Sequence, residues 1–276
     1  MKKQTLSAFT ESAIMIALAT VLSFVKLLDL PYGGSITVGS MFPMIALSYR
    51  HGLKVGLLGG VTFSVIQLLT GLGTLSYATS WQSAVAIIML DYIIAFSVTS
   101  LAVVGRYIFK NNQTAGLISG GVIVCVLRYI CHTISGCTVW AGVSVPDTQG
   151  LIYSLSYNAT YMIPETVVLI AILWYVSRII DLRHENLRTV TKRETAKKGA
   201  ITTTALGWIA VLSAVVYDTV AVFSVLQNAD TGELDFSQIA SAPWINIAVV
   251  SAVCIVICAI LLIIGAKIKV KSKKTV

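Results

Sequence analysis

Residues 82–108 read QSAVAIIMLDYIIAFSVTSLAVVGRYI, an apolar stretch interrupted by one carboxylate, Asp91, before the basic end at Arg106. About 20 apolar residues suffice for a helix to cross the hydrocarbon core of a bilayer, so the stretch predicts a transmembrane helix. A carboxylate inside such a helix is costly and marks a candidate functional site. The stretch therefore indicates both the class of the protein and the place to look for its function.

The composition of the whole chain agrees with a membrane protein. Of the 276 residues, 56% are hydrophobic and 12% are charged, whereas soluble domains carry about 25% charged residues. The mean hydropathy is +0.84. Transmembrane β-strands would be shorter and would alternate apolar with polar residues, which these segments do not do. We expect an all-α polytopic membrane protein.

The apolar segments predict eight spans, at roughly 8–28, 36–50, 54–72, 82–108, 114–138, 150–180, 201–227 and 243–266. The second is short and is expected to be tilted or partly re-entrant. The chain divides into a six-helix substrate-binding membrane domain (1–180), a basic cytoplasmic linker (181–200) and a two-helix membrane extension (201–276).

The net charge is +8, and the distribution of the charged residues along the chain predicts the orientation of the protein in the membrane. With a cytoplasmic N-terminus, all basic residues except Lys26 and Arg128 fall in cytoplasmic segments, where Lys and Arg are enriched. The outer loops carry acidic residues and no Lys or Arg. Both termini are therefore expected in the cytoplasm. No cleavable signal sequence is evident after Met1.

Polar and aromatic side chains converge near the outer ends of three predicted spans. Asp91 lies about two turns inside the fourth span and His132 lies near the outer end of the fifth. At the same predicted depth in the membrane lie Tyr92, Trp140, Tyr153 and Asn158. A carboxylate and aromatic faces attract an organic cation, while Asn and His can donate or accept hydrogen bonds. We expect a pocket for a small, flat, positively charged ligand.

Each of these residues has a simpler interpretation when taken alone. Tyr and Trp form belts at membrane interfaces, and a membrane His often packs between helices. Asp91 is harder to explain in this way, because burying a carboxylate costs about 2.5–3.5 kcal/mol. Arg128 and Glu165 are interpreted as an ion pair between the fifth and sixth spans, with a proton relay as the alternative. Asp218 has no evident partner.

Two further patterns have structural interpretations. The spacing of the cysteines matches no common zinc site, so they are expected to be packing residues, and no metal or other cofactor is predicted. Ala13 and Ala17 form a small-xxx-small pattern in the first span, of a kind that lets another helix approach closely. Packing inside the protein is the simpler reading of this pattern.

The order and spacing of these motifs resemble the ThiT-type thiamine-binding S components of energy-coupling factor transporters. The resemblance covers residues 8–180. It rests on Asp91-Tyr-Ile-Ile-Ala-Phe96, Arg128-Tyr-Ile-Cys-His-Thr-Ile-Ser-Gly136, Trp140 and Tyr153-Ser-Leu-Ser-Tyr-Asn158. It implies a six-helix protein with an outward-facing pocket that captures thiamine or a close relative. The last two spans have no counterpart in the family.

The resemblance also implies roles for particular residues. Asp91 and Tyr92 would hold the thiazolium, and Trp81 would belong to an aromatic lid. The remaining pocket positions would be His132, Trp140, Tyr153 and Asn158. The implied partners are a transmembrane T component, which docks on the Ala13–Ala17 face, and two cytoplasmic ATPases.

We therefore expect a substrate-binding subunit for ATP-driven import, without enzymatic activity. The chain has no Gly-rich phosphate-binding loop ending in Lys-Ser/Thr, so ATP hydrolysis by that route would have to come from a partner. The alternative is a self-sufficient, proton-coupled secondary transporter of thiamine or a related cation, using Asp91 or the Arg128–Glu165 pair. An enzyme would need a nucleophile or a metal cluster, and the sequence offers no convincing one. A polar pocket open to the outside argues against a purely structural protein.

Overall fold

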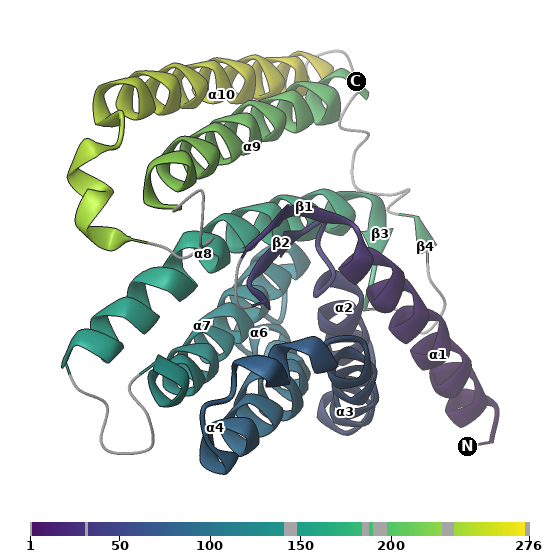
Figure 1. The fold of residues 1–276 in the computed structure, drawn as a ribbon. Coiled ribbons are helices and arrows are strands. Elements are labelled where there is room, and N and C mark those ends of the chain that lie inside the picture. Colours follow the sequence, from purple (N-terminus) through teal and green to yellow (C-terminus); the bar gives the residue numbers. More distant parts are fainter. Residues whose placement is uncertain are drawn as a thin grey trace. The chain divides into compact units, whose positions relative to one another are not determined.

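The computed structural model describes residues 2–30, 33–140, 148–183, 188–189, 198–227 and 235–273, which are almost entirely helical (Figure 1). Contacts within the chain divide it into two compact units, Met1–Arg188 and Thr189–Val276. Helices long and apolar enough to cross a membrane are found in both units, seven in all among the described residues. The structure thus confirms an all-α, multi-pass membrane protein.

The first unit contains most of the secondary-structure elements. In chain order they are α1 (Lys2–Phe24), β1 (Lys26–Asp29), β2 (Ser35–Thr37), α2 (Phe42–His51), α3 (Leu53–Thr70), η2 (Leu72–Tyr77), α4 (Trp81–Ala86), η3 (Ile87–Ile94), α5 (Ala95–Ser97), η4 (Val98–Ala102), α6 (Val103–Ile108), α7 (Gln113–Trp140), α8 (Thr148–Ile179) and β3 (Ile180–Asp181). Strand β3 pairs with β4 (Arg188–Thr189) at the boundary between the units.

The predicted second span differs from the structure. Residues 36–50 form most of strand β2 and of the 10-residue helix α2, rather than a helix long enough to span. A helix of that length is about 15 Å long, which is half of the roughly 30 Å hydrocarbon core. Strand β2 pairs antiparallel with β1, so the chain returns from the end of α1 as a hairpin.

The short helix α2 is the centre of the first unit. Residues 43–49 are all buried, and α2 packs against α1, α3, α6, α7 and α8. Proline in the first turn fits a helix start, and Gly52, with a φ of 85°, ends the helix and lets the chain turn directly into α3. The apolar run that suggested a span is therefore apolar because it lies in the protein core.

The third long helix, Trp81–Ile108, changes its hydrogen-bonding pattern along its length. Its middle segment η3 is a π-helix and η4 is a 3₁₀-helix. Single π-helical segments are rare and occur often at functional sites. Asp91 lies inside the π segment, so the local helix geometry marks the same residue as the sequence did.

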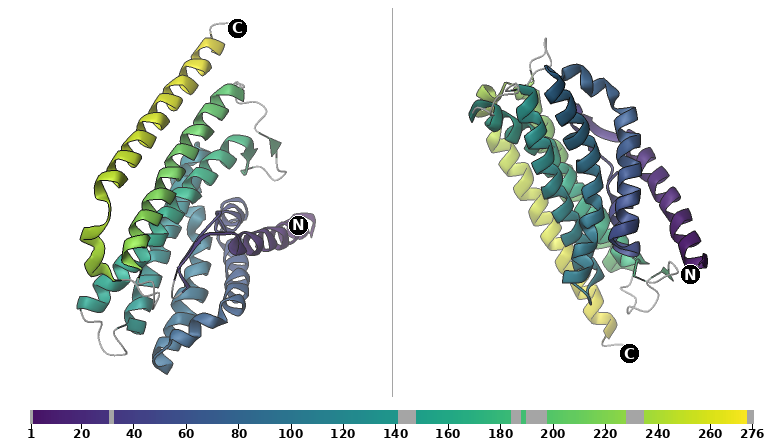
Figure 2. Two further views of the ribbon diagram at one scale, coloured as in Figure 1. Left: turned by 45° about the horizontal axis from the view of Figure 1, so that its top comes forward. Right: turned by 90° about the horizontal axis from the view of Figure 1, so that it is seen from below.

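Helices α7 and α8 run side by side as a long pair (Figure 2). The other side of α7 packs closely on η4 and α6. A Cβ atom on Gly120 would overlap the carbonyl oxygen of Ala102, and one on Gly105 would overlap that of Gly116. Glycine at these positions lets the two helices approach at backbone distance, as small residues do in membrane bundles.

The second unit is a helical hairpin of α9 (Lys198–Leu226), η5 (Phe236–Ser241) and α10 (Trp244–Lys273). Asp218, for which the sequence suggested no partner, accepts a hydrogen bond of 2.5 Å from the Ser251 hydroxyl across the helix pair. Cys258 packs against Gly207, whose missing Cβ would lie 3.2 Å from the sulfur. All five cysteines are free thiols.

The close contact between α6 and α7 leads us to expect that a larger residue there destabilises the folded protein. Gly120→Ala should lower the free energy of unfolding by about 1–3 kcal/mol, because overpacking outweighs the gain in helix propensity. Thermal unfolding in detergent measures the loss. Gly73→Ala is the matched control, since its Cβ would meet open space. Equal melting temperatures for the two variants would contradict the packing argument.

Candidate ligand-binding site

The first unit encloses a cavity of about 280 Å³. Its walls come from the end of α1, the β1–β2 hairpin, α3, η2, η3, α7 and α8. Among the residues predicted to bind a ligand, those that line it are Asp91, Tyr92, His132 and Asn158. Segments up to about 140 residues apart in the chain, from Ser23 to Glu165, therefore meet at one place.

Asp91 joins η3 to α7 through two hydrogen bonds. Its Oδ1 lies 2.8 Å from His132 Nδ1, and its Oδ2 accepts a 2.7 Å hydrogen bond from the Ser135 hydroxyl. The Asp91 side chain keeps 27% of its surface exposed, whereas His132 keeps 11%. The carboxylate is thus held in a defined orientation and still reaches the cavity.

His132 is oriented by Asp91. A carboxylate at Nδ1 keeps a proton on that nitrogen, so a neutral His132 presents Nε2 as an acceptor. Nε2 is buried and has no hydrogen-bond partner among the described residues. Because a buried polar atom without a partner is costly, this nitrogen is suited to a hydrogen bond from a bound molecule.

Tyrosines on η3 and α8 build the walls of the cavity. The Tyr92 hydroxyl donates to the Gly71 carbonyl at 3.0 Å and lies 2.8 Å from the Thr74 hydroxyl, which ties η3 to η2. Tyr157 and Tyr161 pack edge to face with ring centroids 5.7 Å apart. These rings offer aromatic surface to a ligand.

Asn158 and the hairpin are held by these α8 tyrosines. Tyr161 donates a 2.7 Å hydrogen bond to Asn158 Oδ1, and Asn158 Nδ2 donates to the Ser154 carbonyl at 2.9 Å. The backbone N–H of Gly34 donates to the Tyr157 hydroxyl at 3.0 Å. The Asn158 amide is therefore fixed by the protein before any ligand binds.

Arg128 and Glu165 line the same cavity as the other candidates. Arg128 Nη1 lies 3.4 Å from Glu165 Oε2, and each side chain is 7% exposed. Thr37 of the hairpin donates a 3.0 Å hydrogen bond to Glu165 Oε1, and the Arg128 guanidinium stacks 5.1 Å from the Phe96 ring centroid. Arg128 precedes His132 by one helical turn, so both face the same space.

Other predicted residues lie elsewhere. Trp81 is the first residue of α4, is 73% exposed and does not line the cavity. Tyr153 is also absent from the lining. Trp140 ends α7, and its side chain lies outside the described residues.

Sequence reasoning missed several lining or supporting residues. Ser135 follows His132 by three positions. This spacing places both residues on one face of a helix, and it is the signal that could have identified Ser135. Thr37 and Thr74 lie in a hairpin and a 3₁₀ turn, where no periodic signal marks them. Gln67 lies on α3, which carried no candidate residue in the sequence analysis.

The predicted docking residues lie on the free side of α1. Ala13 and Ala17 are exposed, whereas Met15, Ile16 and Ala19 face the core. Within the first unit as described, the small-residue face is therefore not used for internal packing.

Comparison with known proteins gives the family. Residues 9–182 match the model of the family described as "Thiamine transporter protein (Thia_YuaJ)". The thiamine transporter ThiT of Bacillus subtilis (strain 168) is 34% identical over 170 residues, which cover 57% of this chain and 83% of that protein. A solved structure of ThiT from Listeria monocytogenes is 25% identical, with a TM-score of 0.49, and covers 62% of this chain and 93% of that chain.

The family model and the Bacillus subtilis relative confirm the resemblance that the motifs around Asp91 and His132 suggested. The family model ends at residue 182 and so includes α1 to α8 but neither α9 nor α10. The chain belongs to the thiamine transporter family.

Proposed function

We propose that this protein captures thiamine, or a close relative, outside the cell as the substrate-binding subunit of an ATP-driven importer. The observation that carries the proposal is the Asp91 carboxylate, held in a π-helical segment at the wall of a cavity lined by tyrosines. The relative from Bacillus subtilis is named a thiamine transporter, which supports the choice of ligand.

The charges around the cavity favour a cation. Lys26 is paired with Asp29 at 2.9 Å, and Arg128 is paired with Glu165. With a neutral His132, Asp91 is then the one uncompensated charge among the charged residues of the lining. A thiazolium ring carries a fixed positive charge and would be attracted by Asp91 and by tyrosine faces.

The other half of the ligand needs hydrogen-bonding groups. An aminopyrimidine has an amino group that donates and ring nitrogens that accept. The free Nε2 of His132 would accept from the amino group. Asn158 is proposed to contact the ring edge, Tyr153 and Trp140 are proposed as further pocket positions, and Trp81 is proposed to belong to an aromatic lid.

The proposal includes partners, because the chain has no phosphate-binding loop of its own. A transmembrane T component would dock on the exposed Ala13–Ala17 face of α1, and two cytoplasmic ATPases would supply the energy. Both termini would lie in the cytoplasm. The buried Arg128–Glu165 pair keeps proton-coupled transport as the second candidate, since a carboxylate in the cavity wall can exchange a proton.

Ligand identity is tested directly by binding. Purified protein should bind thiamine and should not bind pyridoxine, which lacks a fixed cation. Isothermal titration with both compounds makes the comparison, and mass spectrometry of protein purified from rich medium identifies the ligand that it carries. Failure to bind either compound would reject the substrate while leaving the fold in place.

Asp91→Asn should weaken thiamine binding by about ten- to hundredfold, because the change keeps the size and removes a charge-assisted contact. Calorimetry on folded protein measures the loss. Asp181→Asn, the same chemical change in strand β3 outside the cavity lining, is the control and should bind like the wild type. Unchanged affinity in Asp91→Asn would give Asp91 a structural role.

Ala13→Leu and Ala17→Leu should abolish uptake and leave thiamine binding intact, because a larger side chain keeps a partner helix at a distance. Uptake is measured in cells that contain the ATPases and, to separate the two transport modes, in cells that lack them. Ala252→Leu, at an exposed position of α10, is the control. Normal uptake in both α1 variants would exclude this face as the docking surface.

A further inference from the structure

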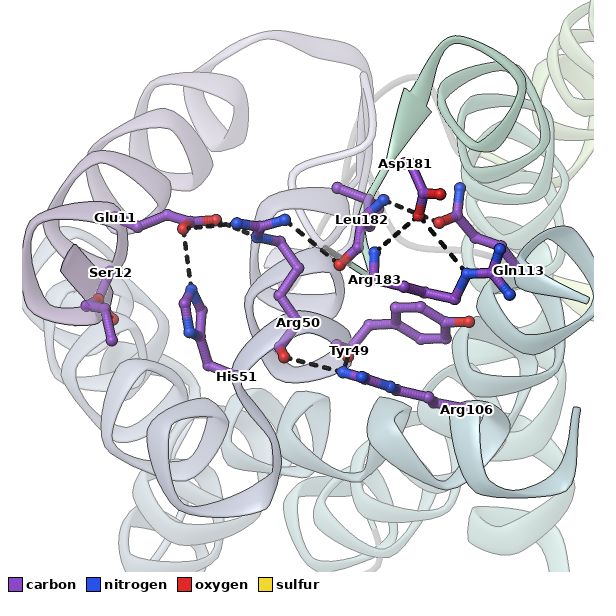
Figure 3. A network of polar contacts seen from close by, with 11 residues as sticks. Glu11, Ser12, Tyr49, Arg50, His51, Arg106, Gln113, Asp181, Leu182 and Arg183 are labelled. Carbon is purple, nitrogen blue, oxygen red and sulfur yellow. Dashed lines mark hydrogen bonds and ion pairs between the residues drawn. The ribbon is translucent and has the colours of Figure 1, made fainter. Parts of the chain in front are cut away.

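A polar network lies at the end of the first unit where α2 stops (Figure 3). Glu11 of α1 forms an ion pair with Arg50, whose Nη2 lies 3.0 Å from Glu11 Oε2. His51 Nε2 lies 2.9 Å from the same oxygen. The Glu11 carboxylate therefore contacts two neighbouring residues in the last turn of α2.

Arg50 is itself held in place from several sides. Its side chain is 3% exposed, and its Nη1 donates to the Leu182 carbonyl at 3.3 Å. Arg106 of α6 donates 3.0 Å hydrogen bonds to the carbonyls of Tyr49 and Arg50. The Arg50 guanidinium is thus fixed within the packed part of the unit, and the Glu11 carboxylate reaches it from α1.

Helix α1 packs against α2 and α3, but the described part of it makes few other polar contacts with neighbouring elements. Ala19 alone is fully buried among the described side chains of α1, and its apolar contacts to the core come from Met15, Ile16 and Ala19. A second polar contact, from Gln67 to the Ser23 hydroxyl at 3.0 Å, lies near the other end of the helix. Apolar contacts with lipid or protein are nearly equivalent inside a membrane, so polar contacts decide how such a helix is placed.

The position of Glu11 determines which side of α1 faces outward. Successive residues of an α-helix turn by about 100°, so Ala13 points about 200° away from Glu11 and Ala17 about 240° away. When the Glu11 carboxylate is bound to Arg50 and His51, both alanines must face away from α2. Both are exposed in the structure.

We propose that Glu11 is a positioning residue for transport: its ion pair with Arg50 and its hydrogen bond with His51 fix the rotation of α1 so that Ala13 and Ala17 are presented to the membrane partner. The inference rests on the proposed function, in which that face docks. Glu11 has no contact with the cavity, so its role is separate from ligand capture.

Glu11→Gln tests this proposal in the full-length protein. The change keeps the shape and removes the charge that binds Arg50 and His51. Amide hydrogen exchange of α1 should become about tenfold faster or more, since charge-assisted hydrogen bonds contribute about that factor. Thiamine affinity should stay within about twofold of the wild type, while ATPase-dependent uptake should fall about tenfold or more. Glu11→Asp, which keeps the charge, should recover part of the uptake.

Asp181→Asn is the matched control, because it removes a carboxylate at the same end of the unit that pairs with Arg183. It should leave α1 exchange and uptake unchanged. Unaltered α1 exchange in Glu11→Gln would overturn the proposal, and so would normal uptake. Loss of thiamine binding in Glu11→Gln would also overturn it, since Glu11 would then support the whole fold.

A wild-type protein that binds thiamine but shows no ATPase-dependent uptake would refute the proposed function and the docking role of the face. The hydrogen-exchange comparison would still decide whether Glu11 holds α1. The two failures are therefore distinguishable.

Discussion

A polar or charged side chain in an apolar interior needs a hydrogen-bonding partner, and three such contacts join the helices of the first unit. Asp91 and His132 join η3 to α7, Arg128 and Glu165 join α7 to α8, and Glu11 joins α1 to the end of α2. Apolar contacts alone place membrane helices weakly, because lipid offers an equally apolar neighbour. Each pairing sets the rotation of the helices that it connects.

The short helix α2 and the hairpin before it create the space for the site. Backbone that is not helical is tolerated at membrane depth only where it is covered by protein or lines a cavity. The hairpin satisfies its backbone groups by pairing β1 with β2, and its turn and second strand line the cavity. A full-length second span would fill this region with apolar side chains.

The proposed capture site and the proposed docking face lie in different parts of the first unit. The cavity is lined by the hairpin, α3, η2, η3, α7 and α8 as well as by the end of α1, whereas the small-residue face lies on the outer side of α1. Helix α1 nevertheless reaches both, because Ser23 and Phe24 at its end line the cavity. This arrangement suits a subunit that must hold a ligand and a membrane partner at the same time.

The sequence by itself determined the membrane class, the family and the residues around Asp91, because hydropathy and helical spacing are local properties. His132, Arg128 and Ser135 share a face through spacings of three and four residues. The sequence also suggested that Arg128 pairs with Glu165, but the tertiary structure alone decided the other pairings. Ser135 and His132 both bind Asp91, and Thr37 binds Glu165, which lies 128 positions further along the chain. It also showed that residues 36–50 are core rather than span and that Trp81 points outward. Hydropathy cannot make these distinctions, because a side chain buried in protein and one buried in lipid have the same apolar character.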